Sequence, residues 1–226
     1  MKIPLGDGRV ENQNAWRDNL KSFYWLGGSA ASGKTTICSY LSEHFGVGIH
    51  HRDDMIEDHW TRINPQDQPA LWEWREFRER GSLSEFLSRP VDDLVSLLVT
   101  AFHEDFPLTL EDLSQTKLNS RTIVEGLRLP PNLLVPLLED KSRAIWIVPS
   151  LDLHKDLITR RSNKPGAADA TREAAQRQEH LSSVLNELAV TLGIIAAEQG
   201  ASVVRIEHME DLVAAPNIIA HAWGLA

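Results

Sequence analysis

One stretch of the chain combines residue types and a spacing suited to holding a chain of phosphates. Gly28–Thr35 reads Gly-Ser-Ala-Ala-Ser-Gly-Lys-Thr and fits the pattern G-x-x-x-x-G-K-[ST] without a substitution. Backbone N–H groups must converge on phosphate oxygens at the start of a helix, and Gly28 and Gly33 permit the dihedral angles and the close approach that this requires. Lys34 would then reach the β- and γ-phosphates, and the Thr35 hydroxyl would ligate Mg²⁺. The pattern therefore predicts a site for ATP and Mg²⁺.

The segments on either side of this loop are those that a phosphate-binding loop needs. Phe23–Leu26 before it is a short apolar run typical of a buried strand, and Thr35–Phe45 after it has a helical pattern with Ile37 and Leu41 on one apolar face. The alternative is a glycine-rich turn that merely opens a helix, and the order strand, loop, helix favours phosphate binding over it. The residues predicted to bind the nucleotide are Gly28, Ser29, Ala31, Ser32, Gly33, Lys34, Thr35 and Thr36.

Two aspartates follow the next predicted strand, Val47–His51. In a parallel sheet built around a phosphate loop, the carboxyl ends of neighbouring strands open on the same crevice, so Asp53 and Asp54 are expected to face the γ-phosphate. Asp53 is the predicted catalytic group that takes a proton from an attacking hydroxyl or orients it. Asp54 is a candidate substrate contact, or else it only N-caps a helix that starts at Met55. Which of the two aspartates is the base stays open.

Further charged residues are predicted at the same crevice. Glu125 ends the third strand signal, Arg121–Gly126, and could hold a Mg²⁺-bound water or a substrate hydroxyl, while Arg128 supplies positive charge near an acceptor. Arg160 and Arg161 close a helical stretch after the fourth strand. Arginines on a segment that closes over a phosphate site can neutralise developing charge and exclude water, so both are catalytic candidates together with Lys34. The alternative is an ordinary surface helix.

Residues 56–120 show helical patterns and no strand-like alternation. A segment of this length between two strands exceeds the usual connection, and it predicts a helical insertion that binds the acceptor. His59 and Arg62, one turn apart, either point into the site or form a solvated face. The insertion also holds three of the seven tryptophans, which either line the pocket or only pack: Trp60, Trp72 and Trp74.

Composition limits the classes of partner. The 226 residues, 42% of them hydrophobic, suffice for one α/β domain over 1–226, and the single Cys38 predicts a reducing, cytoplasmic setting. A net charge of −9 argues against nucleic acid or an anionic membrane as partner. No apolar run is expected to reach the roughly 20 residues of a membrane span, and no signal peptide opens the chain. The oligomeric state stays open.

The complete pattern predicts an α/β fold of three layers. Two more strands are expected, Ala144–Val148 and Ser202–Ile206, followed by a closing helix over Asp211–Trp223. The predicted sheet has five parallel strands in the order 2-3-1-4-5 with helices on both faces. Residues 151–178 are expected to form a lid, and residues 1–21 are a lead-in with a short helix over Asn12–Leu20.

Together the loop, the Arg52-Asp53-Asp54 step, the Glu125-Gly126-Leu127-Arg128 step and the basic segment after strand four resemble the small-molecule and nucleoside-monophosphate kinases, including shikimate and gluconate kinases, of the P-loop proteins. The likeness runs through residues 22–215. Gly27–Lys34 and the aspartate step look most like the chloramphenicol phosphotransferase type, in which an aspartate at this place serves as the base. That resemblance implies the role of base for Asp53. The Glu-Gly-Leu-Arg step is similar to the Asp-Gly-x-Pro-Arg run of nucleotide kinases, with glutamate for aspartate and no proline.

These observations predict in-line transfer of the ATP γ-phosphoryl group to a hydroxyl of a small molecule such as an antibiotic or another metabolite. The tryptophans permit a flat acceptor, whereas Arg62 and Arg128 permit an acid or a phosphate ester; ATP or GTP as donor stays open. The alternatives are a nucleoside or nucleotide kinase and, from another class, an ATP-gated binding module. A GTPase switch needs Asn-Lys-x-Asp, and Asn163-Lys164-Pro165 begins that pattern, but Gly166 stands in place of the aspartate.

Overall fold

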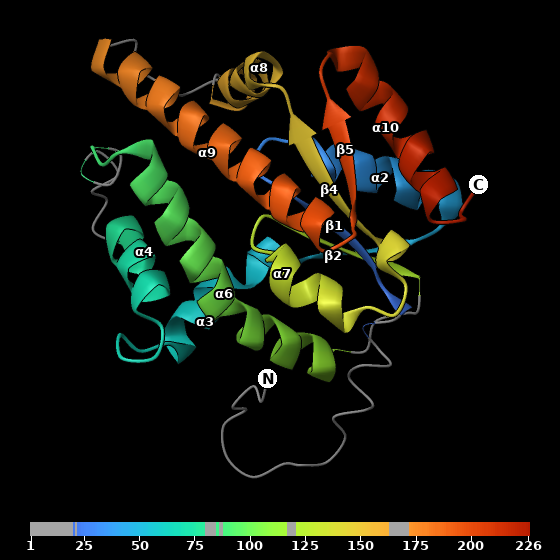
Figure 1. Ribbon diagram of the computed structural model, residues 1–226, viewed down its shortest axis with the longest axis horizontal. Helices are drawn as coiled ribbons and strands as arrows, with labels where there is room; N and C mark the ends of the chain where they lie inside the picture. Colours follow the sequence, from blue (N-terminus) through green and yellow to red (C-terminus); the bar gives the residue numbers. More distant parts are fainter. Residues whose placement is uncertain (1–19, 21, 80–84, 86–87, 117–120, 163–171) are drawn as a thin grey trace.

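Five parallel strands form the centre of the molecule. The computed structural model describes residues 20, 22–79, 85, 88–116, 121–162 and 172–226. The strands are β1 (Tyr24–Gly28), β2 (Gly48–His51), β3 (Thr122–Gly126), β4 (Ala144–Pro149) and β5 (Ser202–Ile206). Their order in the sheet is β2-β3-β1-β4-β5, and every neighbouring pair is parallel (Figure 1). The predicted sheet is therefore confirmed.

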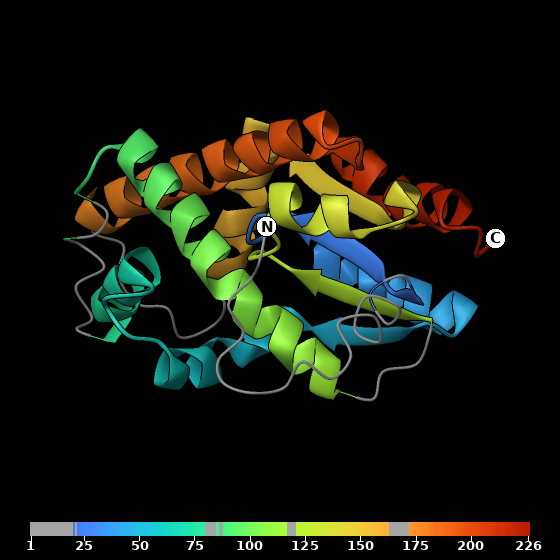
Figure 2. The ribbon, with the colours of Figure 1, turned by 60° about the horizontal axis from the view of Figure 1, so that its bottom comes forward.

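Helices cover both faces of this sheet. They are α2 (Lys34–Phe45), α3 (Ile56–Arg62), α4 (Pro69–Glu79), α6 (Val91–Gln115), α7 (Pro131–Leu134), α8 (Leu151–Ser162), α9 (Arg172–Glu198) and α10 (Met209–Ala222), with 3₁₀ turns η1 (Arg52–Met55), η2 (Val135–Leu137) and η3 (Lys141–Arg143). The pair α2 and α10 packs on one face, and α6, α7 and α9 lie on the other (Figures 1 and 2). This arrangement confirms the three predicted layers.

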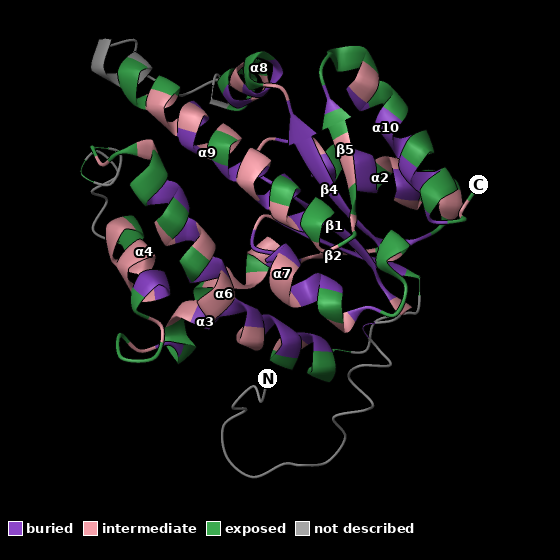
Figure 3. Ribbon diagram, in the orientation of Figure 1, coloured by how far each residue is buried: buried purple, intermediate pink, exposed green. Residues whose placement is uncertain are grey.

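Alternate residues of the central strands face opposite helix layers. Leu26 of β1 and Ile147 of β4 pack with α2 and α10, whereas Trp25 and Trp146 of the same strands belong to the core shared with α6, α7 and α9. A strand covered on both faces must be apolar on both, which is why β1 and β4 read as continuous apolar runs. Figure 3 shows these strands as the buried centre of the molecule.

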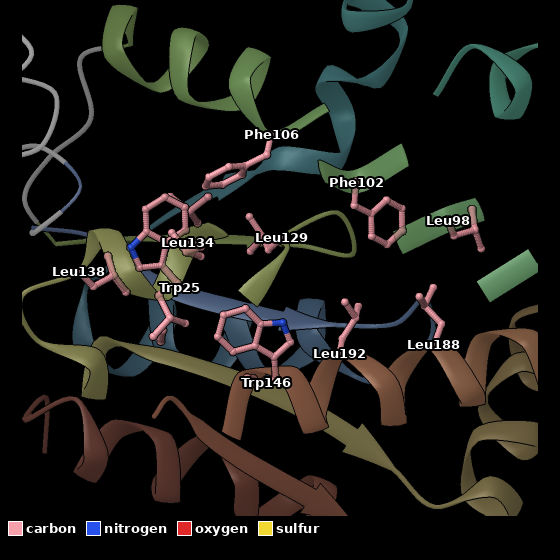
Figure 4. Packing of buried hydrophobic residues seen from close by; sticks show 14 of the residues in the cluster. Trp25, Leu98, Phe102, Phe106, Leu129, Leu134, Leu138, Trp146, Leu188 and Leu192 are labelled. Atoms are coloured by element: carbon pink, nitrogen blue, oxygen red, sulfur yellow. The ribbon is translucent and has the colours of Figure 1, made fainter. Parts of the chain in front are cut away.

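The core on the α6 and α9 side is built around two tryptophans. Trp25 and Trp146 lie in it, with Phe106 of α6 and Leu192 of α9 among their neighbours (Figure 4). A Cβ at Gly27 would lie 2.2 Å from Nε1 of Trp146, so only glycine leaves room for the indole ring beside β1. This packing holds the strand that leads into the glycine loop.

The region after β2 forms helices, and part of it has a core of its own. Leu71 of α4 and Ala101 of α6 are fully buried in a small cluster that the half-buried Trp60 borders. The rings of Trp60 and Trp74 meet edge to face at 6.3 Å, and Trp74 continues to Phe102 at 6.0 Å. Such edge-to-face pairs add to the energy of burial. These tryptophans therefore join the small cluster to the main core.

The closing helix begins two residues earlier than predicted. The pattern placed its start at Asp211, whereas α10 begins at Met209. The carboxylate of Asp211 accepts the backbone N–H groups of Glu207 and His208, each at 2.9 Å, and so caps the helix from inside its first turn. An acidic residue three positions after the cap is a known signal for a helix start, and here it marks His208 as the cap.

One helix corrects an expectation about apolar length. Within the described residues, Gln176–Glu198 of α9 is long and apolar enough to span a membrane by length and composition, although no such run was expected. A single helix of this kind is weak evidence for a membrane, and Leu188 and Leu192 of α9 pack in the main core. The cytoplasmic location stays a prediction. Residues 12–19 of the predicted first helix and the Asn163–Gly166 turn lie outside the described residues.

Candidate functional site

The glycine loop between β1 and α2 depends on left-handed backbone conformations. Gly28 and Gly33 have φ angles of 143° and 90°, and Ala31 between them has a φ of 60°. A Cβ at Gly28 would lie 2.8 Å from the carbonyl oxygen of Ile147, and one at Gly33 would lie 2.4 Å from a methyl group of Leu212. Both glycines of the motif are therefore required by dihedral angle and by space.

The polar groups of this loop are placed for a phosphate ligand. The Lys34 Nζ donates to the carbonyl oxygens of Gly28 at 2.9 Å and Ser29 at 2.8 Å. In the part of the chain that the structure describes, the buried Ser32 hydroxyl has no hydrogen-bond partner, which is costly unless a ligand satisfies it. Thr35 is exposed in the first turn of α2. This set fits a nucleotide with Mg²⁺, since the lysine can turn to phosphate oxygens and the threonine can bind the ion.

A magnesium ion would depend on few protein ligands. No group of three or more His, Cys, Asp or Glu side chains suited to a metal occurs in the described ranges. Mg²⁺ in nucleotide sites is held by one or two protein oxygens, waters and phosphate oxygens, so the exposed Thr35 suffices. Glu125, proposed from sequence for the same crevice, is buried, and its Oε1 lies 2.7 Å from Nδ1 of His51, its partner in the β2–β3 register.

Asp53 lies in η1, directly after β2, and its side chain is 43% exposed. Its Oδ2 accepts the backbone N–H of Leu127 at 2.8 Å, and its Oδ1 lies 3.4 Å from Nε of Arg128 and 3.8 Å from Nη1 of Arg52. Desolvation raises the pKa of this carboxyl. The two guanidinium groups and the hydrogen bond from Leu127 lower it by more than that, so the pKa of Asp53 lies below its ordinary value. Asp53 is ionised at neutral pH.

Charges from several elements converge on the loop lysine. Burial lowers the pKa of Lys34, the carboxylates of Asp53 and Glu125 raise it, and Arg161 of α8 lowers it. The sequence placed Asp53, Glu125 and Arg161 at the crevice of the phosphate loop. All three act on the charge of Lys34, and their place at the crevice stays a prediction.

Two buried arginines lie behind Asp53. Arg52 and Arg128 are each 1% exposed, and both contact the fully buried Asp105 of α6. Nη2 of Arg52 donates to Oδ2 of Asp105, and Nη1 of Arg128 lies 3.2 Å from the same oxygen. Nε of Arg52 donates to the Thr109 hydroxyl at 2.9 Å. The guanidinium group of Arg128, predicted to meet an acceptor, is thus directed at protein groups.

The cluster continues outward through a histidine. Nδ1 of His59 lies 2.5 Å from Oδ1 of Asp105, and its Nε2 lies 2.7 Å from Oδ2 of Asp112. Burial lowers the pKa of His59 to about 4, although Asp112 raises it. A neutral imidazole has one N–H, so two hydrogen bonds to carboxylates need a second proton, which either the ring or one of the two carboxylates carries. Arg62 lies 2.7 Å from Asp112 and 3.0 Å from Asp58, so this predicted substrate contact sits in ion pairs of α3 and α6.

Asp54, Arg160 and Arg161 are exposed. Asp54 lies in η1, and its carboxylate has no hydrogen bond or ion pair within the described ranges. Arg160 and Arg161 lie in the last turn of α8, and neither has an ion pair within the described ranges. Of these two, Arg161 is the one that acts on the charge of Lys34.

Some residues of the site carried no recognisable signal in the sequence. His154 of α8 is fully buried, and its Nε2 donates to the carbonyl oxygen of Ala30 in the glycine loop at 2.7 Å. Nδ2 of Asn186 donates to its Nδ1 at 3.5 Å. Burial and Lys34 lower the pKa of His154, although the bond to Ala30 raises it, so the ring is neutral. The histidine therefore ties α8 and α9 to the phosphate loop.

Asp105 did have a signal that sequence reasoning missed. The apolar stripe of α6 runs through Leu98 and Phe102 at helical spacing, and Asp105 and Thr109 are its next two positions. A charged residue on an apolar stripe must be paired once it is buried. Its position alone therefore indicated a buried ionic cluster.

Comparison with known proteins finds similar solved structures but no match to a family model or a curated protein. A shikimate kinase from Acinetobacter baumannii in complex with shikimate is similar in structure, with a TM-score of 0.49, 14% identity and coverage of 92% of this chain and 97% of that one. An uncharacterized protein from Eubacterium ventriosum has a TM-score of 0.40 and 12% identity, covering 89% of this chain and 97% of that one.

The strand order and the loop between β1 and α2 are enough to name the architecture. The chain has a P-loop fold. Its chemistry must be argued from its own residues, because one fold can serve many functions.

Proposed function

We propose that the chain is a phosphotransferase that moves the γ-phosphoryl group of ATP, with Mg²⁺, to a hydroxyl of a small molecule. The observation that carries this proposal is the placement of Asp53. Its carboxylate is ionised and partly exposed, is held by a backbone N–H and two arginines, and raises the pKa of Lys34 in the phosphate loop. A module that only binds ATP needs no such carboxylate opposite the phosphates.

The residues of the chain divide the reaction between them. The loop amides, Lys34 and Arg161 stabilise the transferring group, and Thr35 would hold Mg²⁺, which would neutralise negative charge on the phosphates. The acceptor oxygen forms a bond to the γ-phosphorus as the bond to the β–γ bridging oxygen breaks, and ADP leaves with that electron pair. Asp53 accepts a hydrogen bond from the acceptor hydroxyl and takes its proton. Because its pKa is low, Asp53 acts mainly by orienting the hydroxyl, and a loose transition state asks little more of a base.

The ion pairs of the site also indicate the charge of the acceptor. The arginines of η1, of α3 and of the segment after β3 are already neutralised, and Arg161 of α8, which has no ion pair within the described ranges, is assigned to the transferring phosphoryl group. Arg52 and Arg128 contact Asp105 and Asp53, and Arg62 contacts Asp58, Glu111 and Asp112. Withdrawing a buried guanidinium from its carboxylate is costly. We therefore propose an acceptor without negative charge.

The proposed lack of negative charge narrows the classes of acceptor that the sequence left open. An uncharged antibiotic, sugar or nucleoside fits, whereas a nucleotide or a sugar acid would need a cation taken from an internal pair or from the α8 arginines beside the transferring phosphoryl group. The finer resemblance to the chloramphenicol phosphotransferase type, carried by Gly27–Lys34 and Arg52–Asp54, belongs to this proposal, as do the cytoplasmic location and the choice of ATP over GTP.

The test is ADP release from Mg-ATP across a panel of uncharged and anionic hydroxyl compounds, with the wild type, Asp53→Asn and Asp54→Asn. Asp54 is a matched control because it is the adjacent carboxylate and is exposed, with no hydrogen bond or ion pair to another described residue. We expect one uncharged class to raise turnover above the water rate, Asp53→Asn to remove that gain, and Asp54→Asn to keep it. Tight ATP binding with background turnover for every compound would instead favour an ATP-gated binding module.

A further inference from the structure

Asp105 occupies a position that links the acceptor-side helices to the phosphate side of the sheet. It lies on α6 with no exposed surface, 53 residues along the chain from Arg52, and its two carboxylate oxygens have different partners. Oδ2 faces the guanidinium groups of Arg52 and Arg128, and Oδ1 faces His59 of α3. One carboxylate therefore contacts groups from η1, from α3 and from the segment after β3.

The two arginines are a pair of like charges held almost without solvent. Each is 1% exposed. Burial is the largest cause that lowers the pKa of Arg52, and the charge of Arg128 is the second. Nη2 of Arg128 also donates to the carbonyl oxygens of Arg52 at 3.3 Å and Asp53 at 3.2 Å. Asp105 and Asp53 are the carboxylates within ion-pair distance of both arginines in the described residues. Of these two, only Asp53 has an exposed face.

We propose that Asp105 is a positioning residue for Asp53, acting through Arg52 and Arg128; the catalytic meaning of this rests on the proposed function. With Asp105 present, both guanidinium groups contact its Oδ2. Their contacts with Oδ1 of Asp53 are then long, at 3.4 Å from Arg128 and 3.8 Å from Arg52. Without it, both cations would turn to the one remaining carboxylate. They would then displace the Leu127 N–H from Asp53 and occupy the lone pairs that an acceptor hydroxyl needs.

His59 sets which oxygen of Asp105 is free for the arginines. Its short contact with Oδ1 leaves Oδ2 to them, and Asp112 holds the far side of the ring at 2.7 Å. The full set of charges around the ring is Asp105, Asp112, Arg52 and Arg128, with Arg62 beyond Asp112. The chain of contacts thus runs from the surface of α3 to the carboxylate at the crevice.

Hydrogen exchange of the Leu127 amide at pH 7 reports on this arrangement, because that N–H donates to Asp53 Oδ2 at 2.8 Å. The test variant is Asp105→Asn, which keeps shape and removes one charge. We expect Leu127 to exchange at least about tenfold faster relative to the amides of β3, since local loss of a hydrogen bond raises exchange at that site alone. Asp211→Asn is the destabilising control, because it removes the α10 cap and should change all amides in proportion.

Thr109→Val is the second variant and decides the question if Asp105→Asn does not fold. It removes the hydroxyl that accepts from Arg52 but no charge. It should move Leu127 in the same direction by a smaller factor. If in the folded variants Leu127 exchanges only in step with β3, Asp105 is a structural residue and the proposal is wrong.

Turnover with an accepted hydroxyl compound separates this proposal from the proposed function. Asp105→Asn should lower kcat at least about tenfold while the Kd for Mg-ATP stays within about twofold, because no hydrogen bond or ion pair joins Asp105, Arg52 or Arg128 to the loop within the described ranges. If Leu127 responds as expected but no compound is phosphorylated, the proposed function fails and the positioning role stands. If turnover is found and neither variant changes the exchange rate of the Leu127 amide relative to β3, the positioning role fails and the proposed function stands.

Discussion

The glycine loop and the arginine cluster behind Asp53 hold their side chains in opposite ways. The loop takes its shape from residues next to one another in the chain, through the φ angles of Gly28 and Gly33 and the start of α2. The cluster takes its shape from ion pairs between residues far apart in the chain, such as Arg52 with Asp105 at a separation of 53 positions and Asp53 with Arg128 at 75. Phosphate recognition is thus local here, and acceptor placement is tertiary.

The two regions also differ in what they leave unpaired. The loop keeps a buried hydroxyl on Ser32 without a partner among the described residues, and exposed hydroxyls on Thr35 and Thr36. The cluster directs the charges of Arg52 and Arg128 at protein carboxylates, although the buried Nη1 of each has no hydrogen-bond partner within the described ranges. A ligand is therefore expected to complete the loop, whereas the charges of the cluster are paired before any acceptor binds. Substitutions should separate the two regions into one that costs activity and one that costs stability.

The largest expected effect is on stability and comes from Asp105→Ala. It leaves two buried guanidinium groups without their shared carboxylate, so the free energy of unfolding should fall by about 3–5 kcal/mol. Urea denaturation followed by circular dichroism measures it. A loss below about 1 kcal/mol would break the comparison, because the cluster would then be as dispensable as a surface ion pair.

Lys34→Met should have the opposite profile. The lysine amine is buried and its pKa is lowered by that burial, so replacing it with an apolar chain should leave stability unchanged or raise it. Transfer should fall by about a hundredfold to a thousandfold through loss of charge stabilisation. Steady-state kinetics and thermal unfolding on one preparation check both parts. A variant that transfers phosphate normally would contradict the role of the loop.

Arg160 and Arg161 offer a matched pair within one helical turn. Arg161 acts on the charge of Lys34 and should lower kcat by about tenfold to a hundredfold when changed to alanine. No such effect of Arg160 on Lys34 is present in the described residues, and Arg160→Ala should change kcat by less than about threefold. Equal losses from both variants would mean that the positive charge of α8 acts as a whole.

The smallest effect concerns pH and His154. Its pKa is lower in the folded protein than the ordinary value of about 6.5, so the unfolded chain binds a proton first as pH falls. The stability linked to this group is therefore complete above about pH 6.5 and is lost as pH falls toward the lower folded pKa. Unfolding free energies of wild type and His154→Gln between pH 7 and 5 should show the flatter dependence in the variant. Parallel curves would show that His154 does not titrate in this range.

The comparison also explains what could be predicted from the sequence. The strand order, the loop and the placement of Asp53 follow from local patterns and from the rule that parallel strands open on one edge. The role of Arg128 does not, because its partner Asp105 lies on a helix whose position the sequence does not reveal. His154 had no signal at all, since a histidine in a helix reads the same on the surface and against a loop. Only Asp105 of these three residues had a signal in the sequence, because it is a charged residue on the apolar stripe of α6.

Gly126 leaves the space in which the Asp53 carboxylate lies. A Cβ there would be 3.0 Å from Oδ1 of Asp53 and 3.4 Å from two carbons of Arg52, so alanine would require these side chains to shift by a few tenths of an ångström. Such a shift would change the geometry of the hydrogen bond from the Leu127 N–H to Oδ2 of Asp53. The missing side chain after β3 therefore acts as a spacer that sets the position of the carboxylate.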